Sequence, residues 1–402
     1  MNLFEDIIKF QHDLASIRRD IHANPELSYQ EHRTAGKVAE LLEKWGFGVT
    51  TGIGGTGVVG TLQGRQKTDG PVRTVGLRAD MDALPLQEHN QFAHASRNPG
   101  KMHACGHDGH TAMLLGAAWH LSQHSDFAGT IHLIFQPAEE GGAGAQAMID
   151  DGLFERFPCE AVFGMHNWPG MAVGQFAVTS GPMLASANDF EIEVEGRGAH
   201  AALPHDGADA VVVACHLVQA MQTVVSRNIR PIESGVLSVT QIHAGDAMNV
   251  LPNSAVIKGT VRTFTTETLD LMEQRMGEIV DQLPGAFGCS ANMKFKRNYP
   301  PLINHEAQTQ FAQSVIREMV GPANLHGFEP SMGSEDFAFM LAAKPGCYVM
   351  IGNGEGNHRD AGHGLGPCSL HNPSYDFNDD LLPIGASYWV HLAHRWLATP
   401  KD

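Results

Sequence analysis

Long basic runs and long apolar runs are both missing from this 402-residue sequence. Its 27 Lys and Arg residues are outnumbered by 44 Asp and Glu residues, which gives a formal net charge of −17 at pH 7. An acidic chain without a basic patch is unsuited to nucleic acid or an anionic membrane surface as its main partner. No stretch approaches the roughly 18 uninterrupted apolar residues of a membrane helix, and the N-terminus lacks the cationic start and apolar block of a secretory signal.

Paired cysteines are missing as well. The six cysteines are scattered and form no Cys-x-x-Cys pair. In a chain of this length, that pattern favours reduced thiols in a cytoplasmic protein over a disulfide framework. What the sequence does contain is 43% apolar residues, enough for two domains with cores of their own, and 23 histidines, which are many for this length.

Helix and strand patterns alternate over roughly the first 185 residues. Apolar residues recur at helical spacing in residues 3–21 and 38–45. Strand patterns that end in polar residues follow in RTVGLRADMD, GTIHLIFQPAEE and AVFGMHNW, and a buried-helix pattern, TAMLLGAAWHLSQH, lies between the first two. This alternation predicts an α/β fold with a mixed, largely parallel sheet flanked by helices, whose functional groups gather at the carboxyl ends of the strands.

The pattern changes between residues 186 and 301. A strand, a helix, two adjacent strands, a helix and a strand follow one another there, which is the βαββαβ order of a ferredoxin-like unit. An α/β pattern resumes near residue 302 and closes with a helix that contains Tyr388 and Trp396. We therefore expect a discontinuous domain, residues 1–185 and 302–402, that carries an inserted domain, residues 186–301.

The segment HACGHDGH, residues 103–110, holds three histidines and a cysteine within eight residues. If residues 103–107 are extended, Cys105 and His107 project from one face, because side chains two apart on a strand do so. A thiolate and an imidazole presented together suit a borderline-soft divalent ion. The same residues are compatible with a nucleophilic cysteine and its base, or with a histidine-rich loop around a buried cysteine.

Other polar groups stand at predicted strand ends. Glu139 and Glu140 follow GTIHLIFQP, and two adjacent carboxylates repel each other unless positive charge lies near them. His166 ends the strand AVFGM, and His363 and His371 lie in a C-terminal loop. Taken singly, each is equally typical of a surface residue. Together, at the ends of strands of one sheet, they favour a metal site.

Ordered motifs along essentially the whole chain resemble those of the M20 metallopeptidases, and within them the amidohydrolase branch of hippurate hydrolases, aminoacylase-like enzymes and plant auxin-conjugate hydrolases. The motifs are Arg18–His22 with Pro25 and Glu26, Arg78–Pro85, Met102–Asp108, Gln136–Glu140, Gly164–His166, Gly198–Pro204, Asn249–Pro252, Gly259–Arg262, Gly333–Phe337 and Leu370 with His371. The resemblance implies that the first domain is catalytic and that the insert is a lid and dimerisation domain.

The resemblance also implies two divalent metal ions per subunit, with zinc, manganese, cobalt and nickel all open as the metal. The ligands it implies are Cys105, His107, Glu140, His166 and His371. Cys105 stands where other M20 branches have a bridging aspartate, and a soft thiolate alters the metal preference of a site.

The resemblance assigns further roles next to the metals. Glu139 matches the general base of the family, which takes a proton from metal-activated water and returns it to the departing amine. Asp82 resembles the residue that holds the metal-site geometry. His103, His110 and His363 match no ligand position, so we expect them to pack or to support the ligands.

In the inserted domain, the resemblance implies that His200 reaches the site of the opposite protomer and donates a hydrogen bond to the oxyanion. Asn249 and Arg262, expected on adjacent strands, match the pair that binds the substrate amide and carboxylate. Without the resemblance, His200 and Arg262 would be interpreted as surface residues. A homodimer through the lid domain is implied as well, and a tetramer fits equally.

The expected activity is metal-dependent hydrolysis of the amide bond of N-acyl-L-amino acids, with hippurate-like conjugates as the leading substrate class. The alternatives in the same family are a dipeptidase, a carboxypeptidase and an N-acetyl-amino-acid deacetylase. A cysteine-nucleophile hydrolase would leave Glu139, His166 and His371 without a role. A catalytically inactive metal-binding regulator would lack a ligand or the base, whereas the sequence retains all six.

Overall fold

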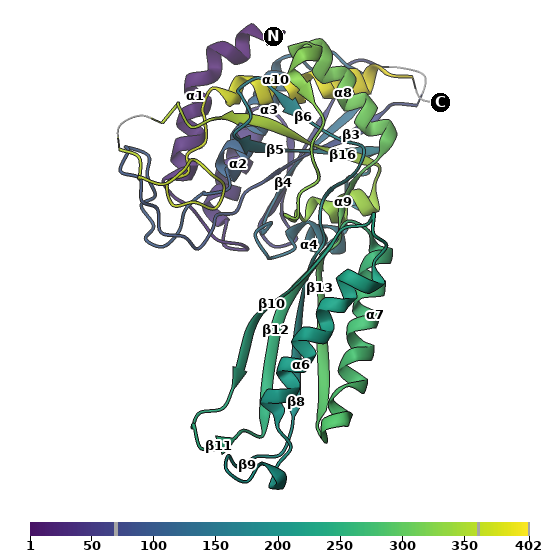
Figure 1. Ribbon diagram of the computed structural model, residues 1–402. Coiled ribbons are helices and arrows are strands. Elements are labelled where there is room, and N and C mark those ends of the chain that lie inside the picture. The colour runs from purple at the N-terminus through teal and green to yellow at the C-terminus, as the bar shows by residue number, and fades with distance from the viewer. Residues whose placement is uncertain (68–70, 360–361, 401–402) are drawn as a thin grey trace. The chain divides into compact units, whose positions relative to one another are not determined.

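The computed structural model describes residues 1–67, 71–359 and 362–400 (Figure 1). The chain divides into two compact units. Unit 1 is formed by Met1–Gly181, Ile303–Glu329 and the chain from Phe339 onward, and unit 2 by Pro182–Leu302 and Pro330–Ala338. Residues 330–338, which the sequence pattern assigned to the first domain, group with unit 2 because the carbonyls of Ser331 and Gly333 accept hydrogen bonds from the N–H of Ala185.

Unit 1 is built on an eight-stranded mixed sheet in the order β1-β2-β4-β3-β5-β16-β6-β15. The neighbours β4, β3, β5 and β16 run parallel, whereas β1 and β2 join antiparallel at one side. Strands β3 and β16 are buried along almost their whole length, which is typical of parallel strands covered on both faces. The strands are β1 (Gly48–Ile53), β2 (Gly57–Gln63), β3 (Thr74–Asp80), β4 (Thr130–Gln136), β5 (Ala161–Pro169), β6 (Phe176–Ala177), β15 (Leu325–His326) and β16 (Gly346–Gly354).

Helices cover this sheet, and α1, α3 and α10 pack against one another (Figure 1). The helix α3 is buried on nearly every side, as the apolar pattern of the sequence predicts, but it begins at His107 rather than at Thr111. The helices of unit 1 are α1 (Glu5–His22), α2 (His32–Lys44), α3 (His107–Gln123), α4 (Gly144–Asp150), α5 (Leu153–Arg156), α8 (Glu306–Val320) and α10 (Leu381–Ala398), with a 3₁₀ turn at Pro322–Asn324. The chain passes between the units near β7 (Gly181–Leu184), β14 (Leu302–Asn304) and α9 (Phe337–Ala343).

Unit 2 is a four-stranded antiparallel sheet in the order β10-β12-β8-β13 with two helices, α6 and α7. Burial alternates along β12, so that every second side chain enters the core with residues such as Ile192, Leu217 and Met276. The elements are β8 (Ala187–Glu195), β9 (Ala199–His200), α6 (Ala210–Thr223), β10 (Gly235–Ala244), β11 (Val250–Leu251), β12 (Ser254–Thr263), α7 (Thr266–Gln282) and β13 (Ser290–Tyr299), with 3₁₀ turns at Pro204–Asp206 and Pro284–Phe287. The βαββαβ order and the mixed α/β sheet of unit 1 confirm the predicted fold class.

The helices of unit 2 begin at recognisable caps. The Asp209 carboxylate accepts hydrogen bonds from the N–H groups of Val211 and Val212 at the start of α6, and the Thr265 hydroxyl accepts one from Thr268 at the start of α7. A π-helical turn, Val224–Asn228, extends α6. The resulting segment, Ala210–Asn228, is the one described helix whose length and composition would allow it to cross a membrane, and a third of it is buried in the unit 2 core.

Candidate active site

The five predicted metal ligands converge at the carboxyl ends of the parallel strands of unit 1. Glu140 follows β4, His166 lies near the end of β5, and Cys105 and His107 flank the start of α3. The Sγ atom of Cys105 lies 3.3 Å from Nε2 of His166, and Nε2 of His371 lies 3.2 Å from Oε1 of Glu140. The sheet therefore gathers side chains from four separate segments of the chain.

These ligand atoms form two groups that share Cys105. One group contains Cys105, His107 and His166, and the other contains Cys105, Glu140 and His371; within each group all donor atoms lie within 4.8 Å of one another. A sulfur atom that belongs to two triads of donors would suit two neighbouring divalent cations.

The local geometry of Cys105 and His107 differs from the predicted one. Residues 103–106 are irregular rather than extended, and α3 begins at His107. The turn between the two ligands is made by Gly106, whose φ is +93°. A Cβ at this position would come within 2.3 Å of Oδ1 of Asn167 and 2.6 Å of the Tyr375 hydroxyl, so that only glycine fits here. The side chains meet because of this turn, not because of the two-residue period of a strand.

The Asp82 carboxylate contacts several of the residues around the site. Its carboxylate accepts hydrogen bonds from the backbone N–H groups of Glu139 and Glu140, each at 3.0 Å, and from the Ser28 hydroxyl at 2.8 Å. Its Oδ1 lies 3.3 Å from Nδ1 of His107, which leaves Nε2 of that ring to face the centre. A carboxylate behind a ligating imidazole is the usual support of a protein metal site. These contacts agree with the positioning role that the family resemblance implies for Asp82, which stays a prediction.

Asp80 and His110 contact each other behind the proposed ligands, and the sequence pattern indicated a supporting role only for His110. Nδ1 of His110 lies 2.6 Å from Oδ1 of Asp80, and the N–H of Asn167 points to Nε2 of the same ring at 3.1 Å. Arg78 donates to Oδ2 of Asp80 at 2.8 Å. The sequence contains one indication of this role for Asp80. Asp80 and Asp82 are two residues apart at the end of one strand, and side chains at that spacing share a face.

His103, His110 and His363, which match no ligand position, have three different surroundings. His103 is buried beside His22 and Asp108, and neither of its ring nitrogens has a hydrogen-bond partner among the described residues. His363 lies in the C-terminal loop, with Nε2 3.3 Å from Oδ2 of Asp376. His110 supports the ligands, whereas His103 packs in the core and His363 belongs to a loop contact.

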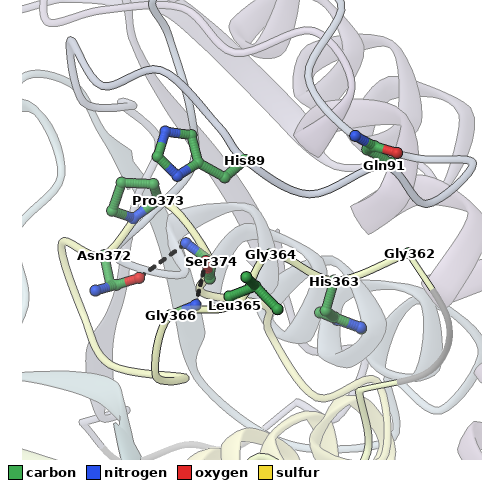
Figure 2. Close-up of a pocket in the computed structure, with 10 residues that line it drawn as sticks. All are labelled: His89, Gln91, Gly362, His363, Gly364, Leu365, Gly366, Asn372, Pro373 and Ser374. Atoms are coloured by element: carbon green, nitrogen blue, oxygen red, sulfur yellow. Dashed lines mark hydrogen bonds between the residues drawn. The ribbon is translucent and has the colours of Figure 1, made fainter.

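The loop that carries His371 is braced by its own hydrogen bonds. Oδ1 of Asn372 accepts from the N–H of Ser374, and Oγ of Ser374 accepts from the N–H of Gly366 (Figure 2). This segment lines an open pocket of about 570 Å³ together with His89. His371 itself has a φ of +59°, and its N–H donates to the carbonyl of Ala104 at 2.8 Å. A non-glycine residue in this conformation is strained, and such strain is typical of functional side chains.

The charges of the site favour a cation. Burial by itself would lower the pKa of His107, but the carboxylates of Asp80, Asp82 and Glu140 outweigh it and raise that pKa to about 10. Burial, reinforced by the carboxylates of Glu140 and Glu139, raises the pKa of the Cys105 thiol well above its ordinary value. An excess of buried negative charge stabilises any positive group placed among these side chains.

The donor atoms also fit a metal. Nε2 of His107 is buried and forms no hydrogen bond with any described residue, while carboxylate oxygens of Asp80, Glu139 and Glu140 lie 3.8, 4.0 and 4.0 Å away. Donors that surround one ion at about 2 Å are separated by roughly 3–4 Å. Nδ1 of His166 lies 2.7 Å from the carbonyl of Asn167, which directs the lone pair of Nε2 toward Cys105.

The three predicted site residues of the insert lie in unit 2. His200 is exposed at the end of β9, where its Nδ1 accepts a hydrogen bond from the N–H of Ala202. Asn249 is exposed in the turn before β11, and its carbonyl accepts from Ala201. Arg262 is partly buried near the end of β12; burial lowers the pKa of its guanidinium, and Asp189 opposes this change.

The prediction that Asn249 and Arg262 lie on adjacent strands is wrong. Asn249 belongs to a turn, and Arg262 is eight residues beyond Ser254, the first residue of β12. Eight residues of strand span about 26 Å, at about 3.3 Å each. The two side chains therefore do not form a pair within one unit 2, because the β10–β12 hairpin is long enough to separate its turn from its base.

Comparison with known proteins identifies the protein family. A model of peptidase family M20/M25/M40 matches residues 76–395. The chain belongs to this family. It is 41% identical to a hippurate hydrolase of Campylobacter jejuni, over 99% of this chain and 100% of that protein, and 40% identical to an N-acetyl-L-cysteine deacetylase of Bacillus subtilis, over 97% and 89%. An IAA-amino acid hydrolase of Arabidopsis thaliana is 39% identical, over 96% and 86%.

Solved structures agree with this assignment. A crystal structure from Bacillus subtilis, described as a dinuclear metal binding peptidase from the M20 family, superimposes with a TM-score of 0.83 at 31% identity. The match covers 98% of this chain and 99% of that one. The resemblance to M20 enzymes is thus confirmed, and the protein is an M20 enzyme that hydrolyses amide bonds.

Proposed function

We propose that this M20 enzyme hydrolyses the amide bond of N-acyl-L-amino acids, with hippurate-like conjugates as the leading substrates, and releases a carboxylic acid and an amino acid. The observation that carries the proposal is the pair of donor triads that share Cys105. Two divalent ions would be held there, one by Cys105, His107 and His166 and the other by Cys105, Glu140 and His371.

The chemistry follows from the side chains around this centre. When bound, divalent ions of this kind acidify a water molecule and polarise an amide carbonyl. Glu139 lies beside the ligands, with an oxygen 4.0 Å from Nε2 of His107 and its backbone fixed by Asp82. We assign it as the general base that takes a proton from the attacking water and delivers it to the departing amine.

The substrate class rests on what the relatives share. The hippurate hydrolase, the N-acetyl-L-cysteine deacetylase and the IAA-amino acid hydrolase are all named for amides between an acyl group and an amino acid. An amino-acid carboxylate suits a guanidinium, so we propose Arg262 as the carboxylate-binding residue. Asn249 directly precedes β11, the strand that pairs with His200, and we propose that it binds the substrate amide together with His200 at the centre of the partner subunit. A carboxypeptidase among the relatives, 37% identical, keeps peptide substrates as the second candidate.

We also propose that the enzyme is a cytoplasmic homodimer. Strand β10 lies at the edge of the unit 2 sheet and exposes Ile242, and such an edge is suited to pairing with another chain. We propose that His200 acts on the oxyanion at the centre of the partner subunit. The described cysteines are all free thiols, in keeping with a reducing compartment.

A cysteine-nucleophile mechanism is disfavoured by the same site. Burial and the surrounding carboxylates raise the pKa of Cys105, so that without a cation the thiol is a poor nucleophile. Treatment with a chelator separates the two mechanisms: we expect complete loss of turnover and recovery with added Zn²⁺, Mn²⁺, Co²⁺ or Ni²⁺. Full activity of the chelated, metal-free protein would contradict the metal mechanism.

The substrate proposal is tested by a panel. Initial rates are measured for N-benzoylglycine, N-acetylcysteine, an indole-3-acetyl amino acid and a simple dipeptide, each with the four metals. We expect the highest kcat/KM on an N-acyl amino acid. Activity confined to the dipeptide would overturn this choice in favour of a peptidase.

A further inference from the structure

A second cluster of potential metal ligands lies in unit 1 where α1, α3 and α10 pack together (Figure 1). It consists of Asp6 in the first turn of α1 and of His120 and His124 at the end of α3. Their donor atoms all lie within 4.8 Å of one another. None of these residues belongs to the proposed catalytic centre.

The geometry is that of a chelating site. His120 and His124 are four residues apart on one helical face, with ring centroids 4.5 Å apart. Oδ2 of Asp6 lies 2.7 Å from Nδ1 of His120 and 3.3 Å from Nε2 of His124. The other carboxylate oxygen accepts a hydrogen bond from the N–H of Ile7, which fixes the direction of the group.

We propose that Asp6, His120 and His124 bind a transition-metal cation such as Zn²⁺ or Ni²⁺, and that this ion joins α1 to α3. Two imidazoles one helical turn apart and a carboxylate form a donor set that zinc accepts in proteins. Both imidazoles already contact the same oxygen, Oδ2 of Asp6. Only small side-chain rotations are therefore needed for the three donor atoms to surround an ion at about 2 Å.

The site has room for a further ligand. His124 lines an open cavity of about 470 Å³ together with Asp126, Phe127 and His394. The ring of Phe4 covers the other side of His120, at 4.4 Å between centroids. A bound ion would thus be shielded on one side and accessible on the other, with water or His394 available as an additional donor.

This site is separate from catalysis. His107, the catalytic-centre ligand on the same helix, precedes His120 by 13 residues, and 13 residues of α-helix span about 20 Å. The proposal therefore does not depend on the proposed function. An ion that joins Asp6 to His120 closes a loop of more than 100 residues, so we expect it to stabilise unit 1 against unfolding.

The test compares tag-free parent protein with His124→Gln and with the control His12→Gln. His124 and His12 are both exposed, and both variants retain every catalytic ligand. Each protein is equilibrated at the same buffered free Zn²⁺ concentration, and its zinc content and Tm are measured. We expect parent and His12→Gln to bind one equivalent more than His124→Gln, and to gain several degrees more in Tm when zinc is added.

Equal zinc contents and equal zinc-dependent Tm shifts in the three proteins would overturn the proposal. Anomalous diffraction from zinc-equilibrated crystals provides a direct measurement, with a peak expected between Asp6, His120 and His124. Catalytic rates per loaded centre are expected to be the same in all three proteins. A failure of the proposed amidase activity would leave the extra equivalent and its Tm shift unaffected, so the two proposals fail separately.

Discussion

Glu139 and Glu140 are neighbours in the chain, yet their side chains have different surroundings. Each glutamate has an oxygen 4.0 Å from Nε2 of His107, but the Glu140 oxygen also lies 3.2 Å from the ring of His371 and belongs to a donor group with His371 and Cys105. Ala138, which directly precedes them in the turn after β4, has a left-handed conformation with φ of +51°. We therefore propose Glu140 as a ligand and Glu139 as the base.

Replacing Glu139 by Gln removes the proton acceptor while it preserves shape. We expect kcat to fall by roughly 10² to 10⁴, the usual contribution of a general base, with unchanged metal content. Steady-state rates and elemental analysis of the same preparation measure both quantities. Glu155→Gln, at an exposed position, is the matched control. Parental kcat in Glu139→Gln would remove the assignment.

Replacing Asp82 by Asn tests the support beneath the ligands. The asparagine keeps one acceptor oxygen but turns an NH₂ group toward a backbone N–H or toward His107, where the carboxylate now accepts. We expect metal affinity to fall about 10- to 100-fold. Competition with a chromogenic chelator measures this change. Ser28→Ala, which removes one contact to Asp82, is expected to have a smaller effect; equal affinities in all forms would contradict the positioning role.

At the scale of elements, the site depends on how strands and helices end. The turn at Gly106 sets the start of α3, and the caps at Asp209 and Thr265 set the starts of α6 and α7. Between strands, His132 on β4 lies directly opposite Thr61 on β2, and Nδ1 of the ring is 3.0 Å from the threonine hydroxyl. Two predictions belong to this scale.

The first concerns Gly106→Ala. The new Cβ would meet Asn167 and the Tyr375 hydroxyl and would occupy a backbone conformation with φ of +93°. We expect a loss of about 2 kcal/mol or more in stability and a loss of bound metal. Gly36→Ala in α2 has open space around its Cβ and is expected to be neutral or slightly stabilising. The free energy of unfolding and the metal content are measured for both variants. Normal metal content in Gly106→Ala would contradict the argument that this turn brings Cys105 and His107 together.

The second prediction concerns the pH dependence of stability that His132 causes. Burial lowers the pKa of His132 to about 4, whereas an unfolded histidine titrates near 6.5. Between these values the unfolded chain binds the additional proton, so stability falls as pH falls from about 6.5 to about 4, by at most about 3 kcal/mol. Urea unfolding at pH 7 and pH 4.5 measures the change. His132→Gln is expected to show a shallower loss on acidification; an identical loss would contradict the role of this ring.

At the scale of the whole molecule, the proposed metal ligands and the proposed oxyanion donor belong to different units of the chain. Cys105, His107 and His371 lie in unit 1 and His200 in unit 2. Our proposal that His200 serves the partner subunit makes activity a property of the dimer. A chain without His200 and a chain without Glu139 should then restore one active centre when they form a dimer.

Mixing His200→Ala with Glu139→Ala chains tests this directly. Each heterodimer would contain one centre with an intact base and an intact partner histidine, so we expect partial recovery of activity from two inactive preparations. The mixture is dissociated, reassociated and assayed beside each variant alone. No recovery, with heterodimers demonstrated by mass, would show that His200 acts within its own chain or has no catalytic part.

Much of this arrangement could be predicted from the sequence, but not all of it. The family resemblance implied the five ligands and the roles of Glu139 and Asp82, which stay predictions, and the periodicity indicated the ferredoxin-like order of the insert. Asp80 and Asn167 were missed because their roles depend on contacts with His110, a residue of another element. Asn249 was misplaced on a strand because its motif runs into β11, although its own backbone forms a turn.

The sequence by itself determined the elements, the kinds of donor and the positions at which they leave the strands, because periodicity and local motifs are properties of neighbouring residues. Only the tertiary structure decided that Cys105 belongs to both donor triads and that Asp82 accepts hydrogen bonds from the backbone N–H groups of Glu139 and Glu140. The strand order β4-β3-β5 brings these segments together, and a strand order depends on long-range packing that no short stretch of sequence contains.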